Sequence, residues 1–441
     1  MKRYHRLALW VGFLLVFSLL ATIIVVGKTP EAAFASPAAM PSSHLFQISM
    51  LADPEPLQRH LGGIAYNGAD DEYMVVWHNN WNYLADIYAR RISGEGALKA
   101  QFTVATGADG DERDRMDPDI AYNPYLGEYM VVYKIKAEDS ETFRWDVWGR
   151  RVGADGFWRG AEFEIFSWPN RSFSQPRISY SPATRKYLVI ASATDTVSYK
   201  SNDVAGRLIN EDGTTPLAGH NISAQDQTLE PRGGDLAYNW WTSSFLVVWQ
   251  QKFSETDWDI WGARVDDYTG NVIDPPGIFP LDVANADQGR PSIASDLDTR
   301  YLIVWAQKNS TPEPNWDVYG REYDLYGSPV GASFPIYNSS LHDSYPVVDM
   351  LNNQRTVAWE SVWVVGSVTE EIMQFSWNPL DDIIFWLPSQ VAENASEPQV
   401  KIGDDGNYLV VFSPSAISLY HGHIYGRLYR NDTIYLPLLK R

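Results

Sequence analysis

The stretch EYMVVW at residues 72–77 decides the fold, because close copies of it return along the whole chain. Each copy is a short run of aliphatic and β-branched residues, and most copies end on an aromatic residue. Runs of this kind predict β-strands that are buried on both faces. The other copies are EYMVVY at 128–133, KYLVIA at 186–191, FLVVW at 245–249, YLIVW at 301–305, RTVAW at 355–359 and YLVVF at 408–412, with ends 53–58 residues apart.

A second strand-like element precedes each copy, and turn-forming residues such as Asn-Pro or Ser-Pro often separate the two. This predicts a hairpin. The preceding elements are GIAYN at 63–67, DIAYN at 119–123, RISYS at 177–181, DLAYN at 235–239, SIAS at 292–295, VVD at 347–349 and QVKI at 399–402.

Two more elements follow each copy. The third has an Asp-x-aromatic-Gly-Arg pattern and reads DIYARR at 86–91, DVWGRR at 146–151, DVAGR at 203–207, DIWGAR at 259–264, DVYGRE at 317–322, EIMQF at 371–375 and HIYGR at 423–427. The fourth is short and reads FTV at 102–104, FEI at 163–165, NIS at 221–223, FPL at 279–281, FPI at 334–336 and FWL at 385–387.

Four short strands in a repeat of 53–58 residues are typical of a propeller blade, which buries its two apolar faces against its neighbours. The sequence therefore predicts an all-β fold over residues 45–441, a seven-bladed β-propeller with four antiparallel strands per blade. Copy six, residues 345–395, departs most from the pattern but has the right length for a blade.

The ring needs a closing strand, and both ends of the repeat region offer one. LFQIS at 45–49 looks like a fourth strand without a blade of its own, and TIYLP at 433–437 is its rival. We expect the N-terminal segment to complete blade seven, because such pairing removes an open sheet edge.

The N-terminus carries a targeting pattern. Lys2, Arg3 and Arg6 precede an apolar run at 7–26, and Ala33-Phe34-Ala35 offers a small-x-small cleavage pattern. Residues 1–35 are therefore expected to be a signal peptide or a membrane anchor, followed by a linker at 36–44. Either alternative places the propeller outside the cytoplasm, secreted or anchored to the outer face of the cytoplasmic membrane.

Composition removes several functions. A formal net charge of −20 argues against a nucleic acid partner, since phosphate binding needs clustered cations. The chain has no cysteine, which excludes disulfides, thiol catalysis and Cys-ligated zinc. The acidic stretch at 108–119 is expected to be a solvated loop, and we predict no metal and no cofactor.

The third element suggests two interpretations. The repeated Asp, aromatic residue and Arg are expected to be structural, with Asp capping a turn and the aromatic residue and Arg filling the space between blades. The tryptophans next to these aspartates favour a second hypothesis, a multivalent rim in which Trp stacks on sugar rings and Asp binds hydroxyls. The candidate ligand-binding residues are Trp81, Asp86, Trp145, Asp146, Trp258, Asp259, Trp316 and Asp317.

The sequence also leaves room for an enzyme. No nucleophile elbow, zinc-protease motif, phosphate-binding loop or dinucleotide fingerprint is present. If a carboxylate pair serves hydrolysis, the irregular sixth copy is where we expect it, at Glu360, Glu370 or Glu371.

The units DPDIAYNPYLGEYMVVY at 117–133 and WDVWGRRVGADG at 145–156 resemble repeats of large exported bacterial proteins, a mostly uncharacterised group. The resemblance covers about residues 45–441. It implies a propeller-like body and carries no catalytic residues. The regular Trp-rich repeats are also loosely similar to propeller lectins, which implies carbohydrate binding only by analogy.

The main hypothesis is therefore a non-enzymatic extracytoplasmic propeller for binding or assembly, whose ligand is a protein partner or a cell-surface glycan. One alternative is a polysaccharide hydrolase or lyase. Another is an accessory subunit of a membrane complex, held by residues 7–26.

Overall fold

A computed structural model describes most of the repeat region. The described residues are 43–50, 58–81, 84–107, 111–138, 144–223, 229–254, 257–273, 275–284, 286–297, 299–309, 315–365, 367–378, 389–414 and 422–430. Within these ranges the chain forms strands and turns and no α-helix. The described residues therefore contain no helix long and apolar enough to cross a membrane. The predicted targeting segment at 1–35 lies outside them.

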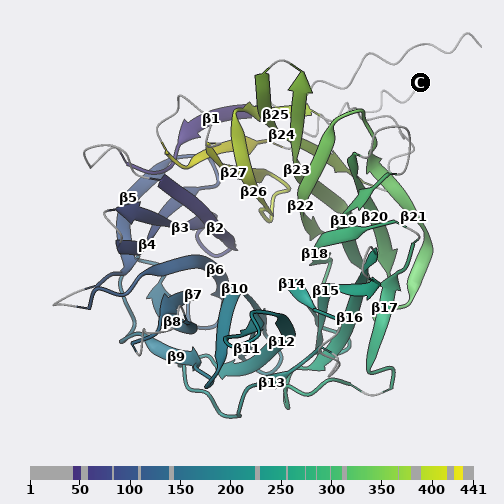
Figure 1. The fold of residues 1–441 in the computed structure, drawn as a ribbon. Helices are drawn as coiled ribbons and strands as arrows, with labels where there is room; N and C mark the ends of the chain where they lie inside the picture. Colours follow the sequence, from purple (N-terminus) through teal and green to yellow (C-terminus); the bar gives the residue numbers. More distant parts are fainter. Residues whose placement is uncertain are drawn as a thin grey trace, which may run out of the picture. The chain divides into compact units, whose positions relative to one another are not determined.

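The strands form seven four-stranded antiparallel sheets arranged in a ring (Figure 1), which confirms the seven-bladed propeller. Blades one to three are β2 (Gln58–Asn67), β3 (Glu72–Trp81), β4 (Leu84–Ser93) and β5 (Leu98–Ala105); β6 (Arg115–Asn123), β7 (Glu128–Lys136), β8 (Trp145–Gly153) and β9 (Phe163–Phe166); and β10 (Arg171–Ser181), β11 (Lys186–Asp195), β12 (Ser201–Asn210) and β13 (His220–Asn221).

The other four blades repeat this order. They are β14 (Arg232–Asn239), β15 (Ser244–Ser254), β16 (Asp257–Asp266) and β17 (Ile278–Asp282); β18 (Gln288–Ser295), β19 (Tyr301–Lys308), β20 (Trp316–Tyr323) and β21 (Pro329–Tyr337); β22 (His342–Leu351), β23 (Gln354–Val365), β24 (Ser367–Trp377) and β25 (Ser389–Glu393); and β26 (Ala395–Ile402), β27 (Tyr408–Pro414), β28 (Tyr425–Tyr429) and β1 (Ser43–Gln47).

The first strand of each blade lies nearest the axis of the ring and contacts the first strands of both neighbouring blades (Figure 1). The fourth strand lies at the periphery. Because neighbouring strands are antiparallel, every first and third strand begins on one side of the ring, where the second strand of each blade connects to the third. We call this side the 2–3 face.

The hydrophobic core lies between the blades. The described buried residues form seven clusters, and each cluster joins side chains from two adjacent blades. The aromatic residues that end the repeated apolar runs within the second strands, such as Trp77 and Trp249, are fully buried there. Each blade therefore depends on its neighbours for burial, as the sequence pattern predicted.

The N-terminal strand closes the ring. β1 pairs with β28, with Phe46 opposite Gly426, and the Ile48 amide donates to the Ile424 carbonyl at 2.7 Å. This confirms the expected closure, although β1 begins at Ser43, two residues earlier than predicted. The rival segment at 433–437 lies outside the described residues.

Blade six is a complete blade, but its fourth strand differs from our prediction. The structure places that strand at β25, and the predicted FWL segment at 385–387 lies outside the described residues. Val391 occupies the buried position that Ile165 holds in blade two. Pairing with β24 shows that residues 389–393 form this strand.

Candidate functional site

The aspartates of the Trp–Asp pairs lie near the start of the third strands, where Asp86 is half-buried and the other three are buried. Asp259 and Asp317 are fully buried, and Asp146 is 6% exposed. Three of them accept a backbone N–H from the segment that follows the fourth strand of the same blade: Asp86 from Gly107 at 3.2 Å, Asp259 from Ala284 at 3.3 Å, and Asp317 from Ser339 at 3.1 Å. Their common role is to fix the link to the next blade. This role is structural, but it differs from the turn cap that the sequence predicted.

The arginines of the same element join neighbouring blades. Arg90 donates to the Ile48 carbonyl at 2.6 Å, Arg150 to the Val104 carbonyl at 2.8 Å, and Arg207 to the Ile165 carbonyl at 2.6 Å. Val104 and Ile165 belong to the fourth strand of the preceding blade, and Ile48 directly follows β1, the fourth strand of blade seven. A hydrogen bond from a charged donor to a buried carbonyl stabilises the junction, because the carbonyl would otherwise lack a partner.

The tryptophans lie beside these aspartates on the 2–3 face and are half-buried. The Lys134 ammonium lies 4.8 Å from the centre of the Trp145 ring, and the Arg232 guanidinium lies 4.1 Å from that of Trp258. Trp316 is also half-buried, at the start of β20, while Trp81 ends β3 with a side chain outside the described set. Cations thus contact two of the rings that the lectin hypothesis requires for sugars.

The structure does not gather the predicted ligand-binding residues into one pocket. The pairs belong to blades one, two, four and five. Their residues lie on the third strand of each blade, except Trp81, which ends β3. Because the pairs share one face of the ring, one ligand with several sugar units could contact more than one of them. The multivalent rim therefore stays a prediction. Their aspartates, however, already have partners within their own blades.

A different set of residues meets around the axis. Every first strand contains a β-bulge near its start, and in six blades the same position lies within the bulge; in blade one the equivalent residue, Leu61, pairs with Trp77 beside the bulge. We call this set the axial ring. It consists of Leu61, Asp117, Gln175, Gly233, Arg290, Tyr345 and Glu397.

The backbone of the axial ring is strained. Asp117, Gln175, Arg290, Tyr345 and Glu397 have φ between +51° and +54°, in the left-handed region that favours glycine. Blade four has Gly233 at this position, with φ of +60°. A non-glycine residue here costs about 1 kcal/mol, yet five blades carry one.

The amide of the axial-ring residue has a repeated partner. In five blades it donates to a side chain of the preceding blade's second strand, at the position directly after Trp77 or its equivalent. The bonds are Leu61 to Ser413 at 3.1 Å, Asp117 to His78 at 3.4 Å, Gly233 to Ser192 at 2.9 Å, Arg290 to Gln250 at 2.8 Å and Glu397 to Glu360 at 2.7 Å. The architecture therefore needs an acceptor at this position but does not dictate which one.

In blades six, seven, one and two, the acceptors and the axial-ring residues include titratable groups that lie close together. The Glu397 carboxylate contacts His60 Nδ1 at 3.1 Å and accepts from the Ser413 hydroxyl at 2.8 Å. The His60 ring stacks on His78 with centroids 5.0 Å apart. Beyond His78, Asp117 forms a 2.7 Å ion pair with Lys134. A continuous polar network thus runs from Glu360 to Lys134.

The environments in this network separate the pKa values of its members. Burial raises the pKa of Glu360 to about 7, and nearby Glu370 adds to the rise. The hydrogen bond from His60 lowers the pKa of Glu397 below its usual value despite partial burial, and the same bond raises the pKa of His60. Burial lowers the pKa of His78 to about 4, so this ring is neutral at pH 7. Separated carboxyl pKa values suit acid–base chemistry.

Beside this network in the axial ring, Arg290 of blade five stacks on Tyr345 of blade six. The guanidinium lies 3.3 Å from the centre of the Tyr345 ring, and both residues are exposed, as is Gln175. The axial ring therefore presents hydrogen-bond donors, acceptors and an aromatic ring to solvent. Unlike residues at equivalent positions break the symmetry of the fold.

The sequence contained a signal for this set. Proline follows the axial-ring residue in five blades, at Pro118, Pro176, Pro291, Pro346 and Pro398. The prediction that residues 108–119 form a solvated loop was partly wrong, because Asp117 and Asp119 lie on β6. The Asp119 carboxylate accepts from the Ile178 amide at 2.9 Å, and burial raises its pKa to about 6.

We found no group of three or more His, Asp or Glu residues arranged to hold a metal ion in the described part of the chain. The network contains carboxylates, two imidazoles and a lysine, of which several already have partners. This arrangement can donate and accept hydrogen bonds and can exchange a proton at Glu360. It offers no described cradle for a cofactor.

Comparison with known proteins supports the fold. No family model matches the sequence, and no curated protein matches it. Among solved structures, the endosialidase of phage phi92 has a TM-score of 0.50 and 7% identity, covering 88% of this chain and 69% of that one. The Pyrococcus furiosus Trilobed protease propeller has a TM-score of 0.46 and 10% identity, covering 87% and 100%. At 7% identity the likeness to the endosialidase shows the fold alone: this chain is similar to β-propellers.

Proposed function

We propose that this protein is a non-enzymatic glycan-binding propeller that works outside the cytoplasm and holds its ligand at the axial ring. The main observation behind this proposal is the bulge position of the first strands. Five blades hold five different non-glycine residues there in a strained, left-handed backbone conformation. Strain of this kind persists where side chains serve a function. A bulge that served architecture alone would favour glycine, as in blade four.

The chemistry of the axial ring favours a hydroxyl-rich ligand. Gln175 and Arg290 offer exposed donors, Glu397 and Asp117 offer carboxylates, and Tyr345 offers an aromatic ring. A protein partner would call for a more apolar centre of the interface. Trp145, Trp258 and Trp316 lie on the same face, so a longer glycan would reach them from the axis.

The test is a glycan array probed with the purified full-length chain and two triple variants. One is Gln175→Ala/Arg290→Ala/Tyr345→Ala, and the other is Trp145→Ala/Trp258→Ala/Trp316→Ala. We expect binding that the first variant weakens at least tenfold and the second weakens less. A folded wild-type chain that binds no glycan would overturn the proposal. Loss confined to the tryptophan variant would move the site to the rim.

One observation favours a second candidate, a polysaccharide hydrolase. Glu360 stays partly protonated near pH 7 beside the ionised Glu397, and two such carboxyls are what glycoside hydrolysis uses. Incubating the chain with the bound glycan distinguishes the candidates. New reducing ends that disappear in Glu360→Gln would favour the hydrolase, whereas an intact glycan would favour binding alone.

A further inference from the structure

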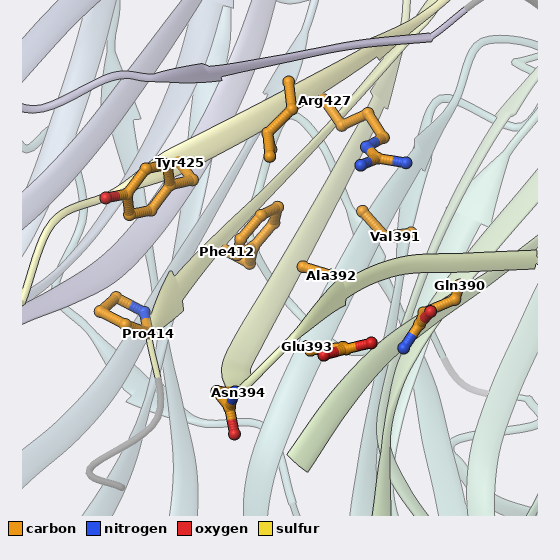
Figure 2. Close-up of a pocket in the computed structure, with 10 residues that line it drawn as sticks. Gln390, Val391, Ala392, Glu393, Asn394, Phe412, Pro414, Tyr425 and Arg427 are labelled. Atoms are coloured by element: carbon orange, nitrogen blue, oxygen red, sulfur yellow. The ribbon is translucent and has the colours of Figure 1, made fainter. Parts of the chain in front are cut away.

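The junction between blades six and seven contains a pocket of about 300 Å³ (Figure 2). Blade six contributes Val391 and Ala392 from β25, and blade seven contributes Phe412, Tyr425 and Arg427 from β27 and β28. The pocket lies among the outer strands of the two blades, so it is separate from the axial ring.

A change in one repeated residue accounts for the space. Phe412 ends the repeated apolar run within the second strand of blade seven, at the position where four other blades carry a fully buried tryptophan: Trp77, Trp249, Trp305 and Trp359. Blade three also has a small residue there, Ala191, but Trp168 and Phe173 fill the gap and pack edge to face at 5.4 Å. In blade seven the smaller Phe412 lines a cavity instead.

The arginine in this pocket also departs from the repeat. Arg427 is equivalent to Arg90, Arg150 and Arg207, which each donate to a carbonyl of the preceding blade. The equivalent carbonyl belongs to Val391, and no such bond forms. The buried Arg427 Nε and the nearby Tyr429 hydroxyl have no well-aligned hydrogen-bond partner among the described residues, although the guanidinium lies close enough to Tyr429 to oppose the rise in the pKa of its hydroxyl.

We propose that this pocket binds a small organic carboxylate with a flat apolar body. The guanidinium would take the carboxylate in a charge-assisted hydrogen bond, since its usual carbonyl partner is not engaged. Phe412, Tyr425, Val391 and Ala392 would enclose the body. The volume is at the lower end for ligand sites and suits a molecule of one ring.

Figure 2 shows Glu393 at the edge of the same pocket, and its side chain is exposed. A carboxylate at the edge opposes an anionic ligand. Removing its charge should therefore strengthen binding, which gives the proposal a second and opposite electrostatic test.

The experiment is titration of the full-length chain with benzoate, followed by NMR chemical-shift and saturation-transfer measurements, with benzyl alcohol as the uncharged control. We expect millimolar benzoate affinity and at least fivefold weaker binding of benzyl alcohol. Arg427→Gln should weaken benzoate about tenfold, whereas Arg150→Gln, the matched change in blade two, should leave it unchanged. Glu393→Gln should strengthen it about twofold.

Phe412→Trp separates a binding site from a packing defect. Restoring the residue of the other blades should fill the space, raise the midpoint of thermal unfolding by about 2 °C and abolish benzoate binding. A folded wild-type chain that does not bind benzoate would overturn the proposal, and so would binding that survives both Arg427→Gln and Phe412→Trp. None of these outcomes depends on glycan binding at the axial ring.

Discussion

The third strands and the first strands of this propeller repeat in different ways. In the third strands the residues repeat: Asp, an aromatic residue, Gly and Arg recur, and their side chains bind the backbone of their own or the preceding blade. At the bulge of the first strands the conformation repeats while the residues differ. A repeated residue marks what the architecture needs, and a repeated conformation with unlike residues marks where the architecture leaves side chains free for function.

The strongest way to break this comparison is to remove an arginine from each region. Arg150→Ala loses the bond to the Val104 carbonyl, the 3.4 Å ion pair with Glu162 and the stacking on Trp158. Because it leaves a buried carbonyl and a buried carboxylate without this partner, we expect unfolding free energy to fall by about 2–4 kcal/mol. Arg290→Ala, in the axial ring, should cost less than about 1 kcal/mol. Urea unfolding measures both, and equal losses would contradict the division of roles.

The second prediction concerns Glu360. Its titratable carboxyl occupies the acceptor position that the neutral Gln250 occupies in blade four. Its pKa of about 7 exceeds the usual 4.5, so the folded state holds a proton that the unfolded state releases. Stability is therefore lost as pH rises from about 4.5 to 7, by up to about 3 kcal/mol. Glu360→Gln keeps an acceptor for the Glu397 amide, as Gln250 does in blade four.

The variant should accordingly be more stable than the wild type at pH 8 and similar to it at pH 4, as measured by urea unfolding at both pH values. Gln250→Glu is the reverse experiment and should destabilise the chain mainly at high pH. If Glu360→Gln destabilises at pH 8, the carboxylate has a structural role that an amide cannot fill.

The third prediction is a smaller pH effect at the junction of blades seven and one. The raised pKa of His60 gives stability that is fully present below about pH 6.5. This stability is lost as the pH rises through the higher pKa of the folded state. The lowered pKa of Glu397 gives stability that is present above about pH 4.5 and is lost as pH falls. Both side chains are 40% exposed, so the pair should contribute less than about 1 kcal/mol.

His60→Gln should therefore reduce the unfolding free energy most near pH 5–6 and least near pH 9. Thermal unfolding across this range checks the profile. A loss that is the same at every pH would mean that packing of the ring on His78, rather than the ion pair, holds His60 in place.

The sequence predicted the ring because the strands carry strong local patterns. EYMVVW and its copies can be satisfied only by burial on both faces, and the fold follows from seven of them. The closing strand was predictable from LFQIS for the same reason. The fourth strand of blade six was not, since FWL at 385–387 and the segment at 389–393 both offer apolar residues, and pairing with β24 decides between them.

The axial ring was harder to predict, because its members share no chemistry. Asp117, Gln175 and Glu397 look unrelated until the following proline and the bulge align them. The Trp–Asp pairs attracted attention because they repeat, yet repetition marked a structural role for the aspartates. Glu360 was singled out as a possible catalytic carboxyl because the sixth copy loses the third-strand pattern. The structure places it in the polar network, and the catalytic role stays a prediction.

The smallest and most direct prediction tests whether axial-ring side chains are kept at a cost. Gln175 is exposed, and its φ of +51° strains any residue except glycine. Gln175→Gly should relieve this strain, offset partly by the entropy of glycine in the unfolded chain, and raise stability by a few tenths of a kcal/mol, roughly 0.5. Gly233→Ala is the matched change in blade four and should lower stability by a similar amount. If Gln175→Gly instead destabilises the propeller, the glutamine is architectural, and the bulge position of blade three belongs with the third-strand arginines.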